Sequence, residues 1–205
     1  MLHRVIIPDP GYLKRCYDLC RRHSALFIAD EIQCGLYRAG SLLASQADGV
    51  RADIVCLGKA LSGGMLPISA VLADRDVMLC IRPGEHGSTF GGNPLACAVA
   101  IASLQVLRDE KLGENAVRLG KKMLESLKSI NAPGIIKEVR GRGLFVAVEF
   151  CPDARVSAWN FCLLLKQRGI ATKPTQRNII RLVCGLLPAC GVTSLIETFL
   201  FRRPL

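Results

Sequence analysis

The first half of the chain alternates between helical spacing and short apolar runs. Helical spacing over 9–23, with Asp9 as the expected N-cap, precedes an apolar run at 25–29. Two further apolar runs follow at 54–57 and 68–72. A helix followed by short buried strands is typical of α/β proteins, so the pattern predicts a mostly parallel sheet.

Two longer helices are predicted in the middle of the chain. A polar, glycine-rich loop at 84–92 precedes Asn93-Pro94, which opens an apolar helix through about Arg108. An amphipathic helix is expected from Glu114 to Ile130. Residues 1–109 are therefore expected to be part of an α/β domain.

The pattern changes after Pro133-Gly134. Strands are expected at 135–136, 144–150, 170–173 and 178–183, with a turn at 140–143 and helices at 155–168 and 191–201. Residues 110–205 are thus expected to form a second, smaller α+β domain.

Composition excludes several protein classes. Half of the 205 residues are apolar and mean hydropathy is +0.31, which excludes a disordered chain. The ten cysteines are scattered without a CxxC pair, and there are three histidines, so we expect neither a disulfide scaffold nor a metal site, and a reducing compartment is favoured. No apolar run is long enough to span a membrane, and the first residues resemble neither a signal nor a transit peptide.

The net charge of +10 is spread along the chain. Small basic clusters occur at 21–22, 121–122 and 202–203, and none is interleaved with aromatic residues. A nucleic-acid-binding module would concentrate its charge on one face, so no nucleic-acid partner is expected. The charge fits solvated helix faces or a pocket for anionic ligands.

Candidate chemistry lies at the ends of two predicted strands. Asp30 follows the first apolar run and Lys59 follows the second. Ligands of open α/β sheets bind at the carboxyl ends of the strands. A carboxylate and an amine there would suit pyridoxal phosphate, which needs a lysine for a Schiff base and an acid near its ring nitrogen. The spacing alone also fits a structural ion pair or two unrelated loop residues.

Three sequence motifs favour the cofactor site over an ion pair or unrelated loop residues. LFIADEIQCG, DIVCLGKALSGGMLPISAV and PGEHGSTFGGNPLACAVA occur in this order and closely resemble class III pyridoxal-phosphate-dependent aminotransferases. Within that family, the segments 60–64 and 83–86 are most similar to the ornithine aminotransferases. The resemblance runs from about 5 to 187 and implies fold type I, with 1–109 as the C-terminal part of the cofactor-binding domain. It is expected to cover only the C-terminal half of the family's fold.

The resemblance also implies roles for individual residues. Lys59 matches the Schiff-base lysine, Asp30 the carboxylate that pairs with the pyridinium nitrogen, and Gln33 a contact of the cofactor's phenolic oxygen. Ser88 and Thr89 match the loop that offers a hydroxyl to the cofactor phosphate of a neighbouring subunit. Each role has an alternative, since Gln33 could merely start a helix and Ser88 could merely form a turn.

The substrate side rests on one residue. Arg181 matches the arginine that binds a substrate carboxylate, a role that suits a planar guanidinium, although it could also be a surface charge at a strand end. Glu31 is expected to pair locally without chemistry.

The resemblance implies transfer of the δ-amino group of L-ornithine to 2-oxoglutarate, giving glutamate 5-semialdehyde and glutamate, within proline and arginine metabolism. Amino acid and 2-oxo acid substrates, a homodimer, and a mitochondrial or cytoplasmic location follow from it. Two alternatives remain open at this point. One is a non-catalytic fragment that pairs with a full-length subunit, and the other is an acetylornithine or 4-aminobutyrate aminotransferase relative.

Overall fold

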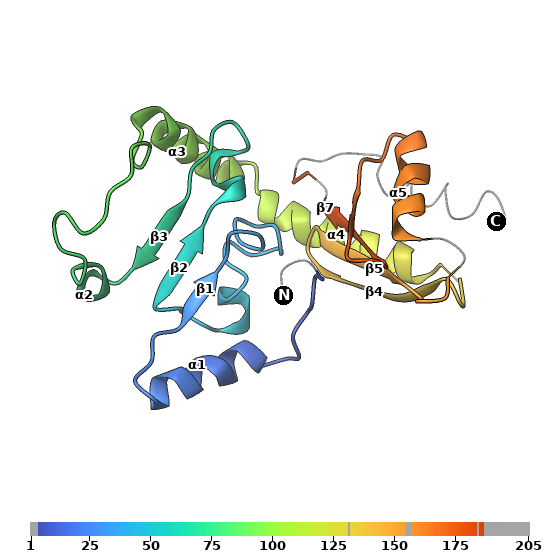
Figure 1. The fold of residues 1–205 in the computed structure, drawn as a ribbon, viewed down its shortest axis with the longest axis horizontal. Coiled ribbons are helices and arrows are strands. Elements are labelled where there is room, and N and C mark those ends of the chain that lie inside the picture. The colour runs from blue at the N-terminus through green and yellow to red at the C-terminus, as the bar shows by residue number, and fades with distance from the viewer. Residues whose placement is uncertain (1–3, 131, 155–156, 184, 187–205) are drawn as a thin grey trace. The chain divides into compact units, whose positions relative to one another are not determined.

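The structure, a computed structural model, describes residues 4–130, 132–154, 157–183 and 185–186. It divides the chain into two compact units (Figure 1). The first unit comprises Pro8–Tyr37 and Ser41–Leu112. The second comprises Met1–Ile7, Arg38–Gly40 and Gly113–Leu205. The predicted domain ranges 1–109 and 110–205 stay a prediction, and the units differ from them mainly in assigning two early segments to the second unit.

The first unit contains a three-stranded sheet with the order β1-β2-β3. Its elements are α1 (Tyr12–Arg22), β1 (Ile28–Asp30), β2 (Ile54–Leu57), β3 (Ala70–Ala73), α2 (Arg75–Met78) and α3 (Pro94–Asp109). Strands β1 and β2 are parallel, with Asp30 opposite Cys56, whereas β3 is antiparallel to β2. The carboxyl ends of β1 and β2 therefore lie at the same edge of the sheet.

Several boundaries of the first unit differ from the sequence prediction. Helix α1 begins at Tyr12, and its N-cap is Gly11 with a φ of 76°, not Asp9. Asp9 contributes its main-chain oxygen instead, which accepts a hydrogen bond from the Tyr12 N–H at 3.0 Å. Strand β1 is not a continuously buried run either, because the side chain of Ile28 is 59% exposed. The N-cap prediction failed because the left-handed conformation of Gly11 starts the helix without a side-chain acceptor.

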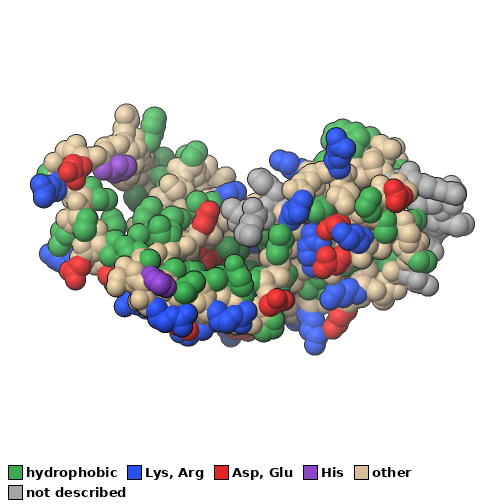
Figure 2. All heavy atoms as spheres, turned by 60° about the horizontal axis from the view of Figure 1, so that its bottom comes forward, with side chains coloured by type: hydrophobic (Ala, Val, Ile, Leu, Met, Phe, Trp, Pro, Cys, Tyr) green, Lys and Arg blue, Asp and Glu red, His purple; other side chains and the backbone are tan. Residues whose placement is uncertain are grey.

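Helix α3 begins where the sequence predicted it. The Asn93 side chain accepts a hydrogen bond from the Ala96 N–H at 3.1 Å, and Pro94 occupies the first turn. Only Ala96, Ala100 and Leu107 of this apolar helix are buried. Other apolar side chains of this helix are exposed, among them Leu95 and Ile101. Figure 2 shows hydrophobic side chains gathered on one face of the first unit.

The second unit is built on a four-stranded antiparallel sheet with the order β4-β5-β7-β6. Its elements are α4 (Leu112–Lys128, in this unit from Gly113), β4 (Ile136–Arg142), β5 (Phe145–Phe150), α5 (Ala158–Gln167), β6 (Lys173–Thr175) and β7 (Ile179–Val183). The central strand β5 carries much of the core, since Val146 and Ala147 have no exposed surface.

The sequence prediction of a turn at 140–143 is wrong in its position. Strand β4 continues through Arg142, and the chain reverses at Gly143 and Leu144. Gly143 has a φ of 55°, and its carbonyl oxygen lies 2.1 Å from where a Cβ on Gly120 of α4 would stand. This close approach of two backbones requires glycine on the helix. The helix predicted at 191–201 lies outside the described residues.

The described residues contain neither a membrane-spanning helix nor a cluster of metal-ligating side chains. No helix in this part of the chain is both long and apolar enough to cross a membrane. Within the same residues, no three His, Cys, Asp or Glu side chains are grouped so that they could hold a metal ion.

Candidate active site

Lys59 stands directly after β2 in an uncommon backbone conformation. Gly58 is extended, and Lys59 then takes a φ of 43° as the first residue of a short 3₁₀ helix, Lys59–Ser62. A non-glycine residue in this region costs about 1–3 kcal/mol and persists only when its surroundings hold it there. The position of Lys59 is therefore imposed by the fold.

The turn after Lys59 supplies that constraint. Ser62 is 1% exposed, and its hydroxyl donates to the Leu66 carbonyl oxygen and accepts from the Leu66 N–H at 3.3 Å. The Leu61 N–H donates to the Gly58 carbonyl oxygen at 3.0 Å. Gly63 follows with a φ of 64°, a conformation that favours glycine. These bonds fix the backbone on the carboxyl side of Lys59.

Asp30 and Gln33 come from the neighbouring strand end. The Glu31 N–H donates to the Cys56 carbonyl oxygen at 3.0 Å, which ties the end of β1 to the end of β2. Gly58 packs beside Ile32, whose Cγ2 would lie 3.4 Å from a Cβ at position 58. The Asp30 carboxylate is exposed and accepts from the Ile32 N–H at 3.2 Å, and Gln33 is half-buried. The structure thus brings the segment 30–33 to the strand end that carries Lys59.

A cavity of about 480 Å³ adjoins Lys59. Its wall is formed by Lys59, Pro67, Ile68, Ser69, Ser88, Phe90, Gly91, Gly92, Asn93 and Ala96. Ser88 accepts a hydrogen bond from the Gly91 N–H at 2.9 Å, so it shapes the loop as well as lining the cavity. Thr89 is exposed beside it and does not line the cavity.

The residues around this cavity fit a phosphorylated pyridine cofactor. The volume lies within the range of about 300–1,000 Å³ for small-molecule sites. The Lys59 amine lines the cavity, whereas Asp30 and Gln33 stand at the same sheet edge without lining it. The loop that lines the cavity offers a hydroxyl and two adjacent glycines whose backbone a phosphate could approach. Ser88 and Thr89 were expected to serve a neighbouring subunit; in this chain Ser88 lines the same cavity as Lys59.

Glu31 and Cys34 lie next to these residues in sequence, but their side chains bond to neighbouring groups of the local fold. Glu31 is 3% exposed and accepts from the Ala44 N–H at 2.9 Å and the Ser45 N–H at 2.8 Å. Burial, with the Glu31 carboxylate beside it, raises the pKa of the Cys34 thiol to about 12. Cys34 therefore stays protonated at neutral pH, and both residues serve the local fold.

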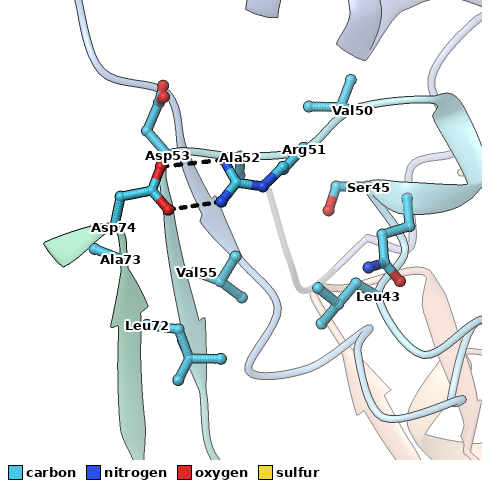
Figure 3. Close-up of a pocket in the computed structure, with 11 residues that line it drawn as sticks. Leu43, Ser45, Val50, Arg51, Ala52, Asp53, Val55, Leu72, Ala73 and Asp74 are labelled. Carbon is cyan, nitrogen blue, oxygen red and sulfur yellow. Dashed lines mark hydrogen bonds and ion pairs between the residues drawn. The ribbon is translucent and has the colours of Figure 1, made fainter.

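A second pocket of about 230 Å³ lies at the amino end of β2 (Figure 3). The Arg51 guanidinium pairs there with the Asp74 carboxylate through contacts of 2.6 and 3.1 Å. Asp53 accepts from the Phe27 N–H at 2.8 Å. The buried Ser45 hydroxyl has no hydrogen-bond partner among the described residues. This pocket lies at the sheet edge opposite to Lys59, so it is separate from the predicted site.

Arg181 lies in β7 of the second unit, whereas the other predicted site residues belong to the first. Its guanidinium carbon lies 5.9 Å from the centre of the Phe145 ring on the adjacent strand. Its carbonyl oxygen accepts from the Thr172 hydroxyl at 3.0 Å. Within its own unit, Arg181 is therefore a half-buried cation against an aromatic ring.

Sequence reasoning missed two features of the site. The cavity wall includes Ile68, Ser69 and Phe90, none of which carried a motif role. The backbone conformation of Lys59 was also not foreseen. The flanking Gly58 and Gly63 were the available signal, because glycines on both sides of a lysine indicate a tight turn.

Known proteins resemble the chain over most of its length. Residues 4–189 match the family Aminotransferase class-III. The mitochondrial ornithine aminotransferase of Oryza sativa is 56% identical over 87% of this chain and 38% of its own length. That of Rattus norvegicus is 53% identical over 89% of this chain and 42% of its own length. The chain thus spans about two fifths of these curated relatives.

Solved structures agree with this match. The crystal structure of ornithine aminotransferase from Toxoplasma gondii superposes with a TM-score of 0.91 at 47% identity, covering 96% of this chain and 47% of that one. Acetylornithine aminotransferase from Elizabethkingia anophelis gives a TM-score of 0.88 at 47% identity, covering 95% and 50%. Together with the matched residues 4–189, these similarities show that the chain belongs to the class-III aminotransferase family.

Proposed function

We propose that this chain carries the lysine-bearing part of a pyridoxal-phosphate-dependent ornithine aminotransferase. The observation that carries the proposal is the position of Lys59, held at a strained turn on the wall of a cavity of about 480 Å³. The identities of 56% and 53% to ornithine aminotransferases support ornithine as one substrate. 2-Oxoglutarate is proposed as the amino acceptor. A Toxoplasma gondii ornithine aminotransferase structure at 48% identity is described with partial occupancy of PLP, which supports the cofactor.

The cofactor, when bound, would supply an electron-withdrawing ring on which amino groups are exchanged. Lys59 would hold it covalently and move a proton to and from the reacting carbon. The Asp30 carboxylate would face the ring nitrogen and keep it protonated. Gln33 would contact the phenolic oxygen, and the loop with the Ser88 and Thr89 hydroxyls would bind the cofactor phosphate of a neighbouring subunit.

Arg181 is proposed to bind a substrate carboxylate. A guanidinium presents two parallel N–H donors that match a carboxylate. The half-buried position of Arg181 against Phe145 favours such pairing, because partial burial strengthens an ion pair relative to an exposed one.

Acetylornithine is the second candidate substrate. The acetylornithine aminotransferase structure superposes on this chain at 47% identity, equal to that of the Toxoplasma gondii ornithine enzyme. The two substrates differ in the charge at one amino group, so competition between them distinguishes the candidates.

The partners are proposed from the exposed surface of the first unit, and the location from the names of relatives. The exposed apolar surface of α3 favours association with a second aminotransferase subunit, either an identical chain or a longer relative. In the second case the chain could act as a non-catalytic fragment. A mitochondrial location within proline and arginine metabolism is proposed because relatives in Oryza sativa and Arabidopsis thaliana are named mitochondrial.

The experiment is a titration of the purified chain with pyridoxal phosphate, followed by visible absorbance. We expect a new saturable band in the wild type that is absent from Lys59→Ala and retained in the matched control Lys121→Ala, an exposed helix position. Addition of ornithine should then remove the band, and acetylornithine should do so less well. An equal band in Lys59→Ala would refute the proposed role of Lys59.

A further inference from the structure

The segment Arg4–Val5 is bound to the sheet of the second unit, although it lies about 140 residues away in sequence from its partners in β4 and β5. The Val5 side chain is 3% exposed and joins a hydrophobic cluster with Phe145, Ala147 and Ile179. We call Arg4–Val5 the strap, because it crosses one face of this sheet.

Arg140 of β4 holds the strap by its backbone. Its Nε donates to the carbonyl oxygens of Arg4 at 3.2 Å and Val5 at 3.1 Å, and its Nη2 donates to that of Arg4 at 2.8 Å. Its Nη1 meets carboxylate oxygens of Glu138 at 2.6 Å and Glu149 at 2.7 Å. The guanidinium therefore uses all three nitrogens, and its side chain is only 12% exposed.

Two further observations show that the strap is constrained. Val5 has a φ of 49°, which is a rare conformation for a β-branched residue and persists only where neighbours impose it. The Arg4 side chain also donates from Nε to the Gln176 amide oxygen at 2.6 Å, in the connection between β6 and β7. The strap is thus tied at both sides of the sheet.

The same face carries Arg181. Arg140 is opposite Ala147 in the pairing of β4 with β5, and Ala147 is opposite Arg181 in the pairing of β5 with β7. Directly opposed residues of antiparallel strands project from the same face. The guanidinium carbon of Arg181 lies 5.9 Å from the centre of the Phe145 ring, and Phe145 shares the buried cluster with Val5.

We propose that Arg140 is a positioning residue for Arg181. By clamping the strap, Arg140 presses Val5 against Phe145 and fixes the ring over which the Arg181 guanidinium lies. The proposal rests on the proposed function, in which Arg181 binds a substrate carboxylate. A rigid support favours binding because less side-chain freedom is lost when the carboxylate arrives.

The test compares the wild-type chain with Arg140→Lys by NMR. Lysine keeps the charge but cannot donate from three nitrogens at once. We expect the carbonyl carbon resonances of Arg4 and Val5 to shift, because lysine cannot donate to both oxygens as the Arg140 guanidinium does. We also expect the Arg181 Nε–H resonance, assigned with Arg181→Lys, to lose the shift caused by the Phe145 ring. Lys137→Met, which removes another partner of Glu149, is the matched control and should leave both readouts unchanged.

Shifted carbonyl resonances of Arg4 and Val5 with an unmoved Arg181 resonance would overturn the proposal, since Arg140 would then hold only the strap. If Arg140→Lys fails to fold, Val5→Ala takes its place and must move the Arg181 resonance in the same direction. Glutarate, a dicarboxylate probe, is titrated separately into the wild type. If glutarate does not shift the Arg181 resonance, the proposed binding of a substrate carboxylate by Arg181 is refuted. That result leaves the role of Arg140 undecided.

Discussion

The two units differ in how they bury their apolar residues. In the second unit, β5 buries Phe145 through Val148, and Phe150 is 1% exposed. In the first unit, Ile28 is 59% exposed, Leu95 64% and Phe90 81%. The second unit therefore covers its own core, whereas the first presents apolar surface of the kind that usually marks an interface.

The residues proposed to bind the cofactor lie in the unit with the more exposed apolar surface, not in the unit with the better-buried core. The strained Lys59 and the residues proposed to bind the cofactor belong to the first unit. Arg181 belongs to the better-packed second unit. The proposed cofactor site thus lies on the unit with more exposed apolar surface, so substitutions in the two units should affect different properties.

The largest effect on stability is expected from Phe150→Ala in the second unit. Removing a fully buried ring should lower the free energy of unfolding by about 3–5 kcal/mol. Phe90→Ala in the first unit removes the same side chain from an 81% exposed position and should change it by less than about 0.5 kcal/mol. Urea unfolding followed by circular dichroism measures both, and equal losses would remove the contrast between the units.

Gly120→Ala tests the close approach of α4 to the β4–β5 turn. Alanine would favour the helix by about 1 kcal/mol at an unconstrained position. Here the new Cβ would lie 2.1 Å from the Gly143 carbonyl oxygen, so we expect a net loss of about 1–3 kcal/mol in unfolding free energy. Lys121→Ala, at the next and exposed position, is the control. A stabilised Gly120→Ala chain would contradict the described contact.

The lowered pKa of Glu149 predicts that the stability of the second unit depends on pH. The Lys137 ammonium, followed by the Arg140 guanidinium, holds the pKa of Glu149 below its usual value of 4.5, against the effect of partial burial. Because the folded pKa is lowered, this contribution to stability is complete above pH 4.5 and is lost as the pH falls through the folded pKa.

The variant Glu149→Gln should therefore be less stable than wild type near neutral pH, and the difference should shrink under acid. Thermal unfolding between neutral and acidic pH measures it. A stability difference that stays constant across that range would show that the Glu149 charge does not contribute.

The smallest effect on stability is expected from Ile101→Ser on α3. Ile101 is 58% exposed, so the unfolding free energy should change by less than about 0.5 kcal/mol. Self-association measured by sedimentation should nevertheless fall, because the substitution removes apolar contact surface. Unchanged association would show that this face of α3 is not an interface.

The sequence correctly predicted those elements whose boundaries depend on residues close together in the chain. Strand β2 was expected at 54–57 and is found there, and Asn93-Pro94 opens α3 as predicted, because an asparagine cap and a proline first turn act within a few residues. Local signals failed at Gly11 and at Gly143, where a left-handed backbone sets the boundary. Such conformations are allowed by glycine but not required by it.

The sequence predicted which residues belong to the candidate site, but not most of the geometry that holds them. Asp30 and Lys59 were expected at strand ends, and parallel pairing of β1 with β2 places those ends at one edge. The positive φ of Lys59, the main-chain partners of Glu31 and the packing of Val5 on Phe145 depend on contacts distant in sequence. One-dimensional patterns carry no information about those contacts. The roles of the six site residues stay predictions: Asp30, Gln33, Lys59, Ser88, Thr89 and Arg181.

The most direct test of the account is covalent trapping at Lys59. The chain is incubated with pyridoxal phosphate at a low molar ratio, reduced with borohydride and digested, and the modified peptide is identified by mass spectrometry. We expect the label on Lys59, because among the described residues only this lysine is held at a strained turn beside a matching cavity. A label spread over exposed lysines such as Lys121 and Lys137, with no preference for Lys59, would contradict it.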